Sequence, residues 1–187
     1  MLGADDGLVS IASLMIGVAA ASASNETIPV AGVAGLVAGS MSMAVGEYVS
    51  VSSQRDSERA DIERETRELE SQPQAELNEL AMIYAERGVE KDLAMEVAQQ
   101  LSARDRLGAH MRDELGVDPD FLLARPMQAA WISAASFATF AVVPVAALLI
   151  APDSSRIPAI AAVSLMSLAA LGAFGGHLGG APPGRAA

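Results

Sequence analysis

The chain has 187 residues, no cysteine and a formal net charge of −11. An acidic chain lacks the basic surface with which proteins neutralise nucleic-acid phosphates, and the absence of cysteine excludes disulfides, thiolate zinc sites and cysteine nucleophiles. The only histidines are His110 and His177, so a metal held by one chain would depend mainly on carboxylates, methionine sulfur and water.

Charged residues are distributed very unevenly along the chain. They are nearly absent from 7–46 and from 126–180, and they crowd into 54–125. This segregation predicts an all-α, polytopic helical membrane protein with membrane blocks at 1–53 and 126–187 around a polar helical insert.

Two spans are predicted in the first membrane block, from apolar stretches at residues 8–24 and 28–53. The acidic residues before the first span could extend its helix, and Pro29 suits the first turn of the second. Small residues that share a helix face allow another helix to approach closely. The second span carries such a face, formed by Gly32, Gly35, Gly39 and Gly46.

The insert contains no strand-like alternation and is predicted to be a small helical hairpin or bundle. Nothing breaks the helix between Val45 and Leu69, so the second span should continue out of the membrane until Pro73. Further helices are predicted at 74–87, 90–101 and 103–115, with Gly88 and Gly116 ending two of them.

The second membrane block predicts spans at 127–150 and 157–178. Trp131 near the start of the third span is typical of an interfacial anchor. Nearly all Lys and Arg residues lie in the insert. Because basic flanks stay in the cytoplasm, the insert and both termini are predicted to be cytoplasmic.

Two pairs of glutamates in the insert are candidate metal ligands. Glu65 and Glu68 are three residues apart, as are Glu76 and Glu79, so each pair shares a helix face. A turn at Pro73 could bring the four carboxylates together, and a divalent cation such as Mn(II), Fe(II), Mg(II) or Ca(II) would relieve their repulsion. The alternative is a solvated surface on which Glu and Arg pair.

The last helix of the insert adds three further candidates. His110 and Glu114 are four residues apart, and Met111 and Glu114 are three apart, so each pair lies on one face. A thioether among carboxylates shifts the preference towards a softer ion such as Fe(II).

Acidic residues and methionines of the membrane block are candidates for an ion path. Asp6 lies at the mouth of the first span, and Glu47 lies near the inner end of the second, beside Met43. A carboxylate inside a bilayer costs roughly 2.5–3.5 kcal/mol and therefore tends to face a cavity. The alternatives are a Glu47 at headgroup depth and a methionine that only fills space. No catalytic motif is present, and we expect the protein not to be an enzyme.

Three stretches of sequence resemble the vacuolar iron transporter family in its bacterial form. They are DGLVS at 6–10, AGSMSMAVGEYVSVSSQRD at 38–56 and GAHMRDELG at 108–116. The resemblance extends over nearly the whole chain, and the run around Gly46-Glu47-Tyr48 is its most specific part.

The resemblance implies an all-helical homodimer with five spans per subunit that exports Fe(II), and in some members Mn(II), in exchange for protons. It places the translocation path on Asp6 and Met43. His110 stands where the family has a second capturing methionine. Gly35 stands where eukaryotic members have a glutamate, and Glu47 is the candidate substitute for it. The capturing residues in the insert would be Glu65, Glu68, Glu76, Glu79, Met111 and Glu114.

The resemblance also leads us to expect a bacterial plasma membrane protein without a prosthetic group. The chain starts at the Asp-Gly motif and stops before a fifth span, so it is predicted to be truncated at both ends. Two alternatives to transport stay open. One is a membrane-anchored metal buffer or sensor, and the other is a membrane assembly protein with a solvated helical insert.

Overall fold

A computed structural model of the chain describes residues 2–21, 25–117 and 124–179. Within these ranges the chain is helical and contains no strand. It divides into two compact units, residues 1–50 with 126–187 and residues 51–125. We refer to them as the membrane unit and the insert.

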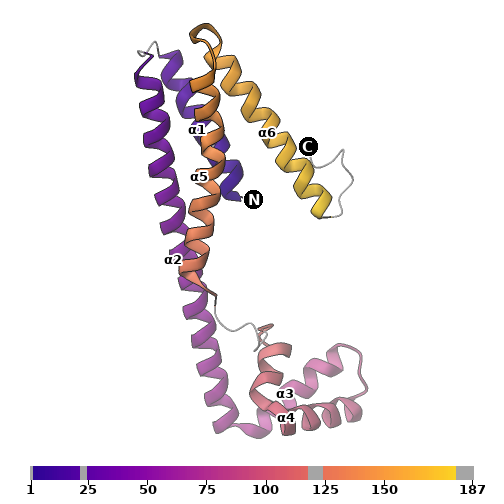
Figure 1. Cartoon of the computed structure of the whole chain (residues 1–187). Helices are drawn as coiled ribbons and strands as arrows, with labels where there is room; N and C mark the ends of the chain where they lie inside the picture. Colours follow the sequence, from indigo (N-terminus) through magenta and orange to yellow (C-terminus); the bar gives the residue numbers. More distant parts are fainter. Residues whose placement is uncertain (1, 22–24, 118–123, 180–187) are drawn as a thin grey trace. The chain divides into compact units, whose positions relative to one another are not determined.

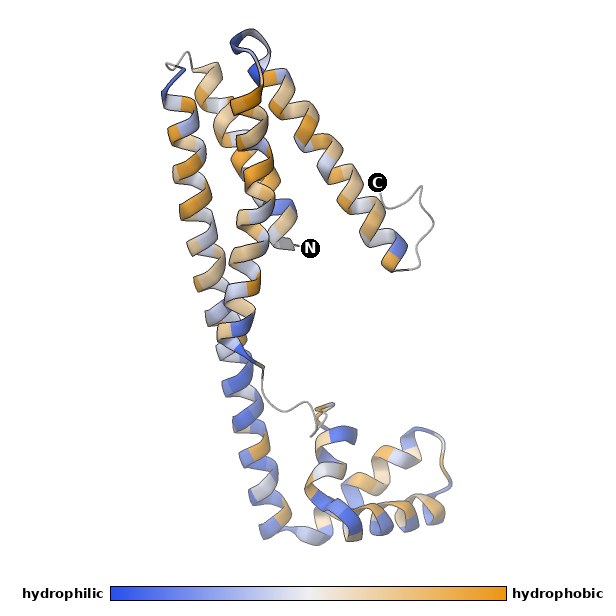
Figure 2. Ribbon diagram, viewed as in Figure 1, coloured by the Kyte–Doolittle hydropathy of each residue, from blue (hydrophilic) through white to orange (hydrophobic). Residues whose placement is uncertain are grey.

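Four of the described helices are long and apolar enough to cross a bilayer. They are α1 (Leu2–Ala20), α2 (Thr27–Ser71), α5 (Pro126–Ile150) and α6 (Arg156–Leu178). Figure 2 shows apolar residues along α1, α5, α6 and the first half of α2, and hydrophilic residues along the second half of α2. The predicted four-span helical membrane protein is therefore confirmed, whereas the predicted end of the first span at 22–24 lies outside the described residues.

The core of the membrane unit lies where α1, α5 and α6 meet. Helix α1 packs against both α5 and α6, which are joined by the short 3₁₀ turn η2 (Asp153–Ser155) (Figure 1). Removal of large apolar side chains from water supplies most of the stabilisation of such a core, together with close packing. The largest buried side chains here are Leu8, Met15, Phe137, Leu148 and Ile160.

The glycine face of α2 packs against side chains of the same chain. A Cβ atom placed on Gly39 would collide with the ring of Phe137 from α5, and one on Gly35 would lie 2.6 Å from Leu14 Cδ2 of α1. A Cβ atom on Gly32 would likewise lie 2.6 Å from Met15 Sδ of α1. The predicted close packing at these glycines is thus found within one chain, while a Cβ on Gly46 would meet nothing within 4 Å.

A close approach of α1 to the backbone of α5 involves a glycine pair that was not predicted from the sequence. Gly3 and Gly7 of α1 face the backbone of α5, and a Cβ on Gly7 would lie 2.5 Å from the Phe137 carbonyl oxygen. A backbone oxygen cannot rotate away as a side chain can. The contact between α1 and α5 therefore requires glycine at position 7.

Gly7→Ala is expected to lower the thermal unfolding temperature of the detergent-solubilised protein. The added methyl group must push α1 and α5 apart, and overpacking of this kind typically costs about 1–3 kcal/mol. Gly17→Ala is the matched control on the same helix, because a Cβ there meets nothing within 4 Å. The control should leave the midpoint unchanged or raise it, since alanine favours helix. Equal midpoints for both variants would contradict the close approach.

The insert contains the polar half of α2 and the hairpin formed by α3 (Pro73–Glu86) and α4 (Lys91–Asp113). Helix α3 begins at Pro73, one residue before the predicted start at 74. It ends before Gly88, whose φ of +97° allows Val89 N–H to donate to Tyr84 C=O. The hairpin encloses a small core of Leu80, Ala81, Ala98 and Ala109.

The last helical stretch of the insert divides into two helices, as predicted, but the division lies three residues later than the predicted residue 102. The backbone of α4 leaves helical geometry at Asp105, with φ −159° and ψ 84°. The reason is local capping. Asp105 Oδ1 accepts a hydrogen bond from Gly108 N–H at 3.0 Å, which is the geometry of an N-cap residue.

Candidate metal centre

Three helices of the insert bring four potential metal ligands together. Glu65 comes from α2, Glu76 from α3, and His110 and Glu114 from the last turn of α4 and its C-cap. One ligand atom of each residue lies within 4.8 Å of the corresponding atoms of the others. The turn before Pro73 thus lets α3 fold back on α2. One carboxylate of each predicted pair, Glu65 and Glu76, enters the cluster.

The cluster is largely shielded from water. His110 is 0% exposed, Glu65 2% and Glu76 7%, while the Glu114 side chain is 27% exposed. Burying ionised carboxylates costs several kcal/mol each unless a counter-charge or hydrogen bonds compensate. Glu114 therefore forms the side of the cluster that water can reach.

The hydrogen bonds within the cluster leave some of its buried atoms unsatisfied. His110 Nδ1 lies 3.0 Å from both Glu65 Oε1 and Glu114 Oε2, but one ring N–H can point at only one of them. The hydrogen-bond geometry at Nδ1 suits Glu114, which leaves Glu65 Oε1 without a hydrogen-bond partner. The other ring nitrogen of His110, Nε2, also has no partner. Three carboxylates around one imidazole are short of positive charge, which a divalent cation would supply.

The pKa of Glu65 is raised to about 7, first by its burial and then by the charge of Glu114, while His110 opposes the shift and Glu76 and Glu68 add to it. The pKa of Glu76 is also raised, first by burial and then by the charge of Glu79. A carboxyl that holds a proton near neutral pH is one from which a divalent cation can displace that proton.

Stability of the metal-free protein is expected to fall as the pH rises from about 4.5 through about 7. Between the ordinary pKa of 4.5 and about 7 the folded state holds a proton on Glu65 that the unfolded chain has lost. The free energy of unfolding therefore decreases with pH through this window, by at most about 3 kcal/mol.

Thermal melts followed by circular dichroism, with and without saturating Mn(II), would measure this dependence. Bound metal should remove or reverse the slope, because the cation replaces the proton. A metal-free protein that becomes more stable over the same range would contradict the shifted pKa of Glu65.

The other predicted ligands of the insert lie outside the four-residue cluster. Glu79 is exposed, Glu68 is half-buried, and Met111 is buried with 3% exposure. The charges of Glu68 and Glu79 still act on Glu65 and Glu76. Their direct roles in metal binding stay predictions.

A second group of predicted residues meets in the membrane unit. Asp5, Asp6, Val9 and Met43 line a cavity of about 430 Å³. Ser10 Oγ donates a hydrogen bond to Asp6 Oδ1 at 2.7 Å. Asp6 and Met43 are therefore brought together as predicted, with Asp5 added, whereas Glu47 is absent from the residues lining this cavity. Two carboxylates beside a thioether can hold a divalent transition metal.

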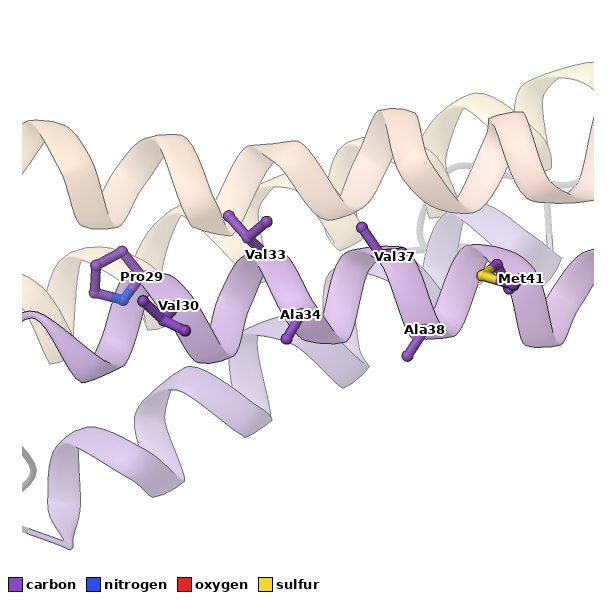
Figure 3. A pocket seen from close by; sticks show the side chains of 7 residues that line it. All are labelled: Pro29, Val30, Val33, Ala34, Val37, Ala38 and Met41. Carbon is purple, nitrogen blue, oxygen red and sulfur yellow. The ribbon is translucent and has the colours of Figure 1, made fainter.

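The outer surface of α2 has a different character. Figure 3 shows an apolar groove along it, lined by Pro29, Val30, Val33, Ala34, Val37, Ala38 and Met41. Its valines and Met41 are exposed. A surface of this composition suits contact with lipid or with another helix and offers no metal ligand except one thioether.

Comparison with known proteins identifies the family. A sequence model of the VIT family matches residues 1–187. The chain belongs to the VIT family. It is 50% identical over 145 residues to a vacuolar iron transporter of Acanthamoeba castellanii, covering 78% of this chain and 52% of that protein. The resemblance to the vacuolar iron transporter family is thus confirmed, while membership of its bacterial form and truncation of the chain stay predictions.

Plant proteins match a shorter part of this VIT-family chain. Vacuolar iron transporter homolog 2 of Oryza sativa is 58% identical over 65 residues, which is 35% of this chain and 34% of that protein. Its Arabidopsis thaliana namesake is 53% identical over 72 residues, 38% of this chain and 37% of that protein. The chain therefore spans about half the length, or less, of these relatives.

One set of polar residues in this VIT-family chain escaped the sequence reasoning. Tyr84 and Arg87 of α3 contact Asp113 at the end of α4, beside the cluster residue Glu114. Asp113 is far from Tyr84 and Arg87 in the sequence, and none of the three has a spacing typical of a metal site. Tyr84 and Arg87, three apart on one helix face, were the only indication available.

Proposed function

We propose that this protein moves Fe(II) or Mn(II) across a bilayer, out of the cytoplasm, in exchange for protons. The observation that carries the proposal is the buried Glu65–Glu76–His110–Glu114 cluster in a member of the VIT family. The names of the relatives, which are vacuolar iron transporters, support iron as the cargo. The cytoplasmic side of the insert and the bacterial plasma membrane stay predictions.

Capture of the ion is assigned to the insert. Three carboxylates and one imidazole offer the mixed oxygen and nitrogen ligands that Fe(II) and Mn(II) accept, and solvent can complete the coordination at Glu114. Mg(II) and Ca(II) prefer oxygen ligands alone, so His110 favours the transition metals. Glu68, Glu79 and Met111 could attract the ion or hold it on its way to the cluster.

Translocation is assigned to the cavity between α1 and α2. Asp6 and Met43 would bind the ion there after it leaves the insert. Protonation of a carboxylate from the far side would neutralise this site and release the metal. Asp6 itself and Glu47 are the candidate proton carriers, and a homodimer is the proposed assembly.

A second candidate function is a membrane-anchored metal buffer or sensor. It is favoured by one observation: all four ligands of the cluster come from the insert, so binding requires no residue of the membrane unit. This function predicts metal binding by the full chain without any flux across a membrane.

Proteoliposomes containing the full chain under a pH gradient would separate the two functions. A fluorescent chelator would record Fe(II) or Mn(II), and a pH-sensitive dye would record protons moving the other way. Coupled movement of metal and protons, lost when an ionophore dissipates the gradient, supports the antiporter. Binding without flux favours the buffer, and no binding at all would reject both.

A further inference from the structure

The segment that carries His110 and Glu114 is a short helix of its own. Helix α4 is interrupted at Asp105, so residues 106–113 form only about two helical turns before the C-cap Glu114. An isolated helix of this length is unstable in water. The positions of the two α4 ligands therefore depend on tertiary contacts of this segment, which are the packing of Ala109 in the hairpin core and polar contacts at both ends.

The beginning of the segment is held by Asp105. Its carboxylate accepts a hydrogen bond from Gly108 N–H at 3.0 Å. A Cβ atom on Gly108 would collide with the same carboxylate, so glycine at this position is what leaves room for the cap.

The end of the segment is held by α3. Tyr84 Oη donates to Asp113 Oδ2 at 2.7 Å, and Arg87 Nη1 donates to Asp113 Oδ1 at 2.5 Å. Arg87 Nη2 also donates to the Asp113 carbonyl oxygen at 3.0 Å, which satisfies a carbonyl left free at the helix end. The Asp113 side chain is 17% exposed, and the guanidinium lies 5.5 Å from the centre of the Tyr84 ring. We call Tyr84, Arg87 and Asp113 the clamp.

We propose that the clamp is a positioning device that sets His110 and Glu114 at the distance from Glu76 that metal binding requires. This inference rests on the proposed binding of metal by the cluster. Asp113 directly precedes Glu114 in the chain and lies three residues after His110. Because α3 carries Glu76 and Tyr84, and Arg87 is its C-cap, the same helix holds one ligand directly and two others through the clamp. Tyr84 and Arg87 act on the metal through Asp113.

Removal of the clamp is expected to release the last turn of α4 and leave Glu65 and Glu76 in place. The site would keep two carboxylates and lose the imidazole as a fixed ligand. Loss of an outer partner of a metal ligand usually lowers metal affinity 10- to 100-fold, and we expect about this loss for Tyr84→Phe and for Arg87→Gln.

The test uses the full chain in detergent and Mn(II) as the probe. Calorimetric titration gives the affinity, and pulsed electron paramagnetic resonance of bound Mn(II) detects a coordinated imidazole nitrogen. Gln100→Ala is the matched control, because Gln100 is an exposed residue of α4 ahead of the Asp105 interruption, and its side chain donates a hydrogen bond to Glu96. Asp105→Ala releases the other end of the same short helix and should show the same two effects.

The clamp is supported if Tyr84→Phe and Arg87→Gln weaken binding and reduce the nitrogen coupling at saturating Mn(II), with helical content and the control unchanged. It is overturned if both variants keep wild-type affinity. It is also overturned if affinity falls while the nitrogen coupling stays intact, because the residues would then only stabilise the fold. A wild-type protein that binds no Mn(II) would reject the proposed metal site, a result that is distinct from either failure of the clamp.

Discussion

Glu65→Gln is expected to weaken Mn(II) binding at least 100-fold while raising the stability of the metal-free protein. Glu65 is 2% exposed and lies 3.0 Å from His110, so its charge is unfavourable without a cation and directly available to one. Here the buried charge pair is the Glu65 carboxylate with the bound cation. Removing one partner of such a pair costs about 3 kcal/mol or more, which corresponds to a loss of over 100-fold in metal affinity. The amide has the shape of the carboxyl and carries no charge to desolvate. The metal-free fold should therefore gain stability at about pH 8.

Weaker Mn(II) binding together with higher metal-free stability would distinguish a metal site from an ordinary buried ion pair, whose loss lowers stability. Titration calorimetry would measure the affinity, and thermal melts would measure the stability of the same variant. Glu63→Gln is the control, because Glu63 lies on the same helix but is exposed. A Glu65→Gln protein that binds Mn(II) like the wild type would remove Glu65 from the site.

Asp6→Asn is expected to reduce metal flux at least tenfold while leaving Mn(II) binding by the insert unchanged. Asparagine keeps the shape of the side chain and can still accept the hydrogen bond from Ser10, so the cavity should persist. What the variant loses is the charge that attracts a cation and the group that exchanges a proton. Met43→Ala, which removes the thioether that also lines this cavity, is expected to have a smaller effect in the same direction.

The decisive measurement for the path is flux in proteoliposomes at matched protein content, beside Mn(II) binding in detergent. Glu26→Gln serves as the control, because Glu26 is an exposed carboxylate of the membrane unit that is not among the residues lining this cavity. Normal transport by Asp6→Asn and Met43→Ala would show that the ion takes another path. Loss of both flux and binding would indicate general misfolding.

Which carboxylates meet in the insert was only partly predictable. The spacing of three residues made Glu76 and Glu79 equivalent candidates, since both fall near one face of α3. Packing of Leu80 and Ala81 against Ala98 and Ala109 sets the rotation of α3 about its axis. This rotation directs Glu76 into the cluster and leaves Glu79 exposed, and it depends on contacts with α4 that no local pattern contains.

By itself the sequence determined the four spans, the continuous α2, the turns at Pro73 and Gly88 and the candidate ligands. These features follow from hydropathy, helix-breaking residues and spacing, all of which act within a few residues. Only the tertiary structure decided that Gly7 lies against the backbone of α5 and that the clamp holds the end of α4. The physical reason is that these features arise from steric contacts and hydrogen bonds between residues that are distant in the chain.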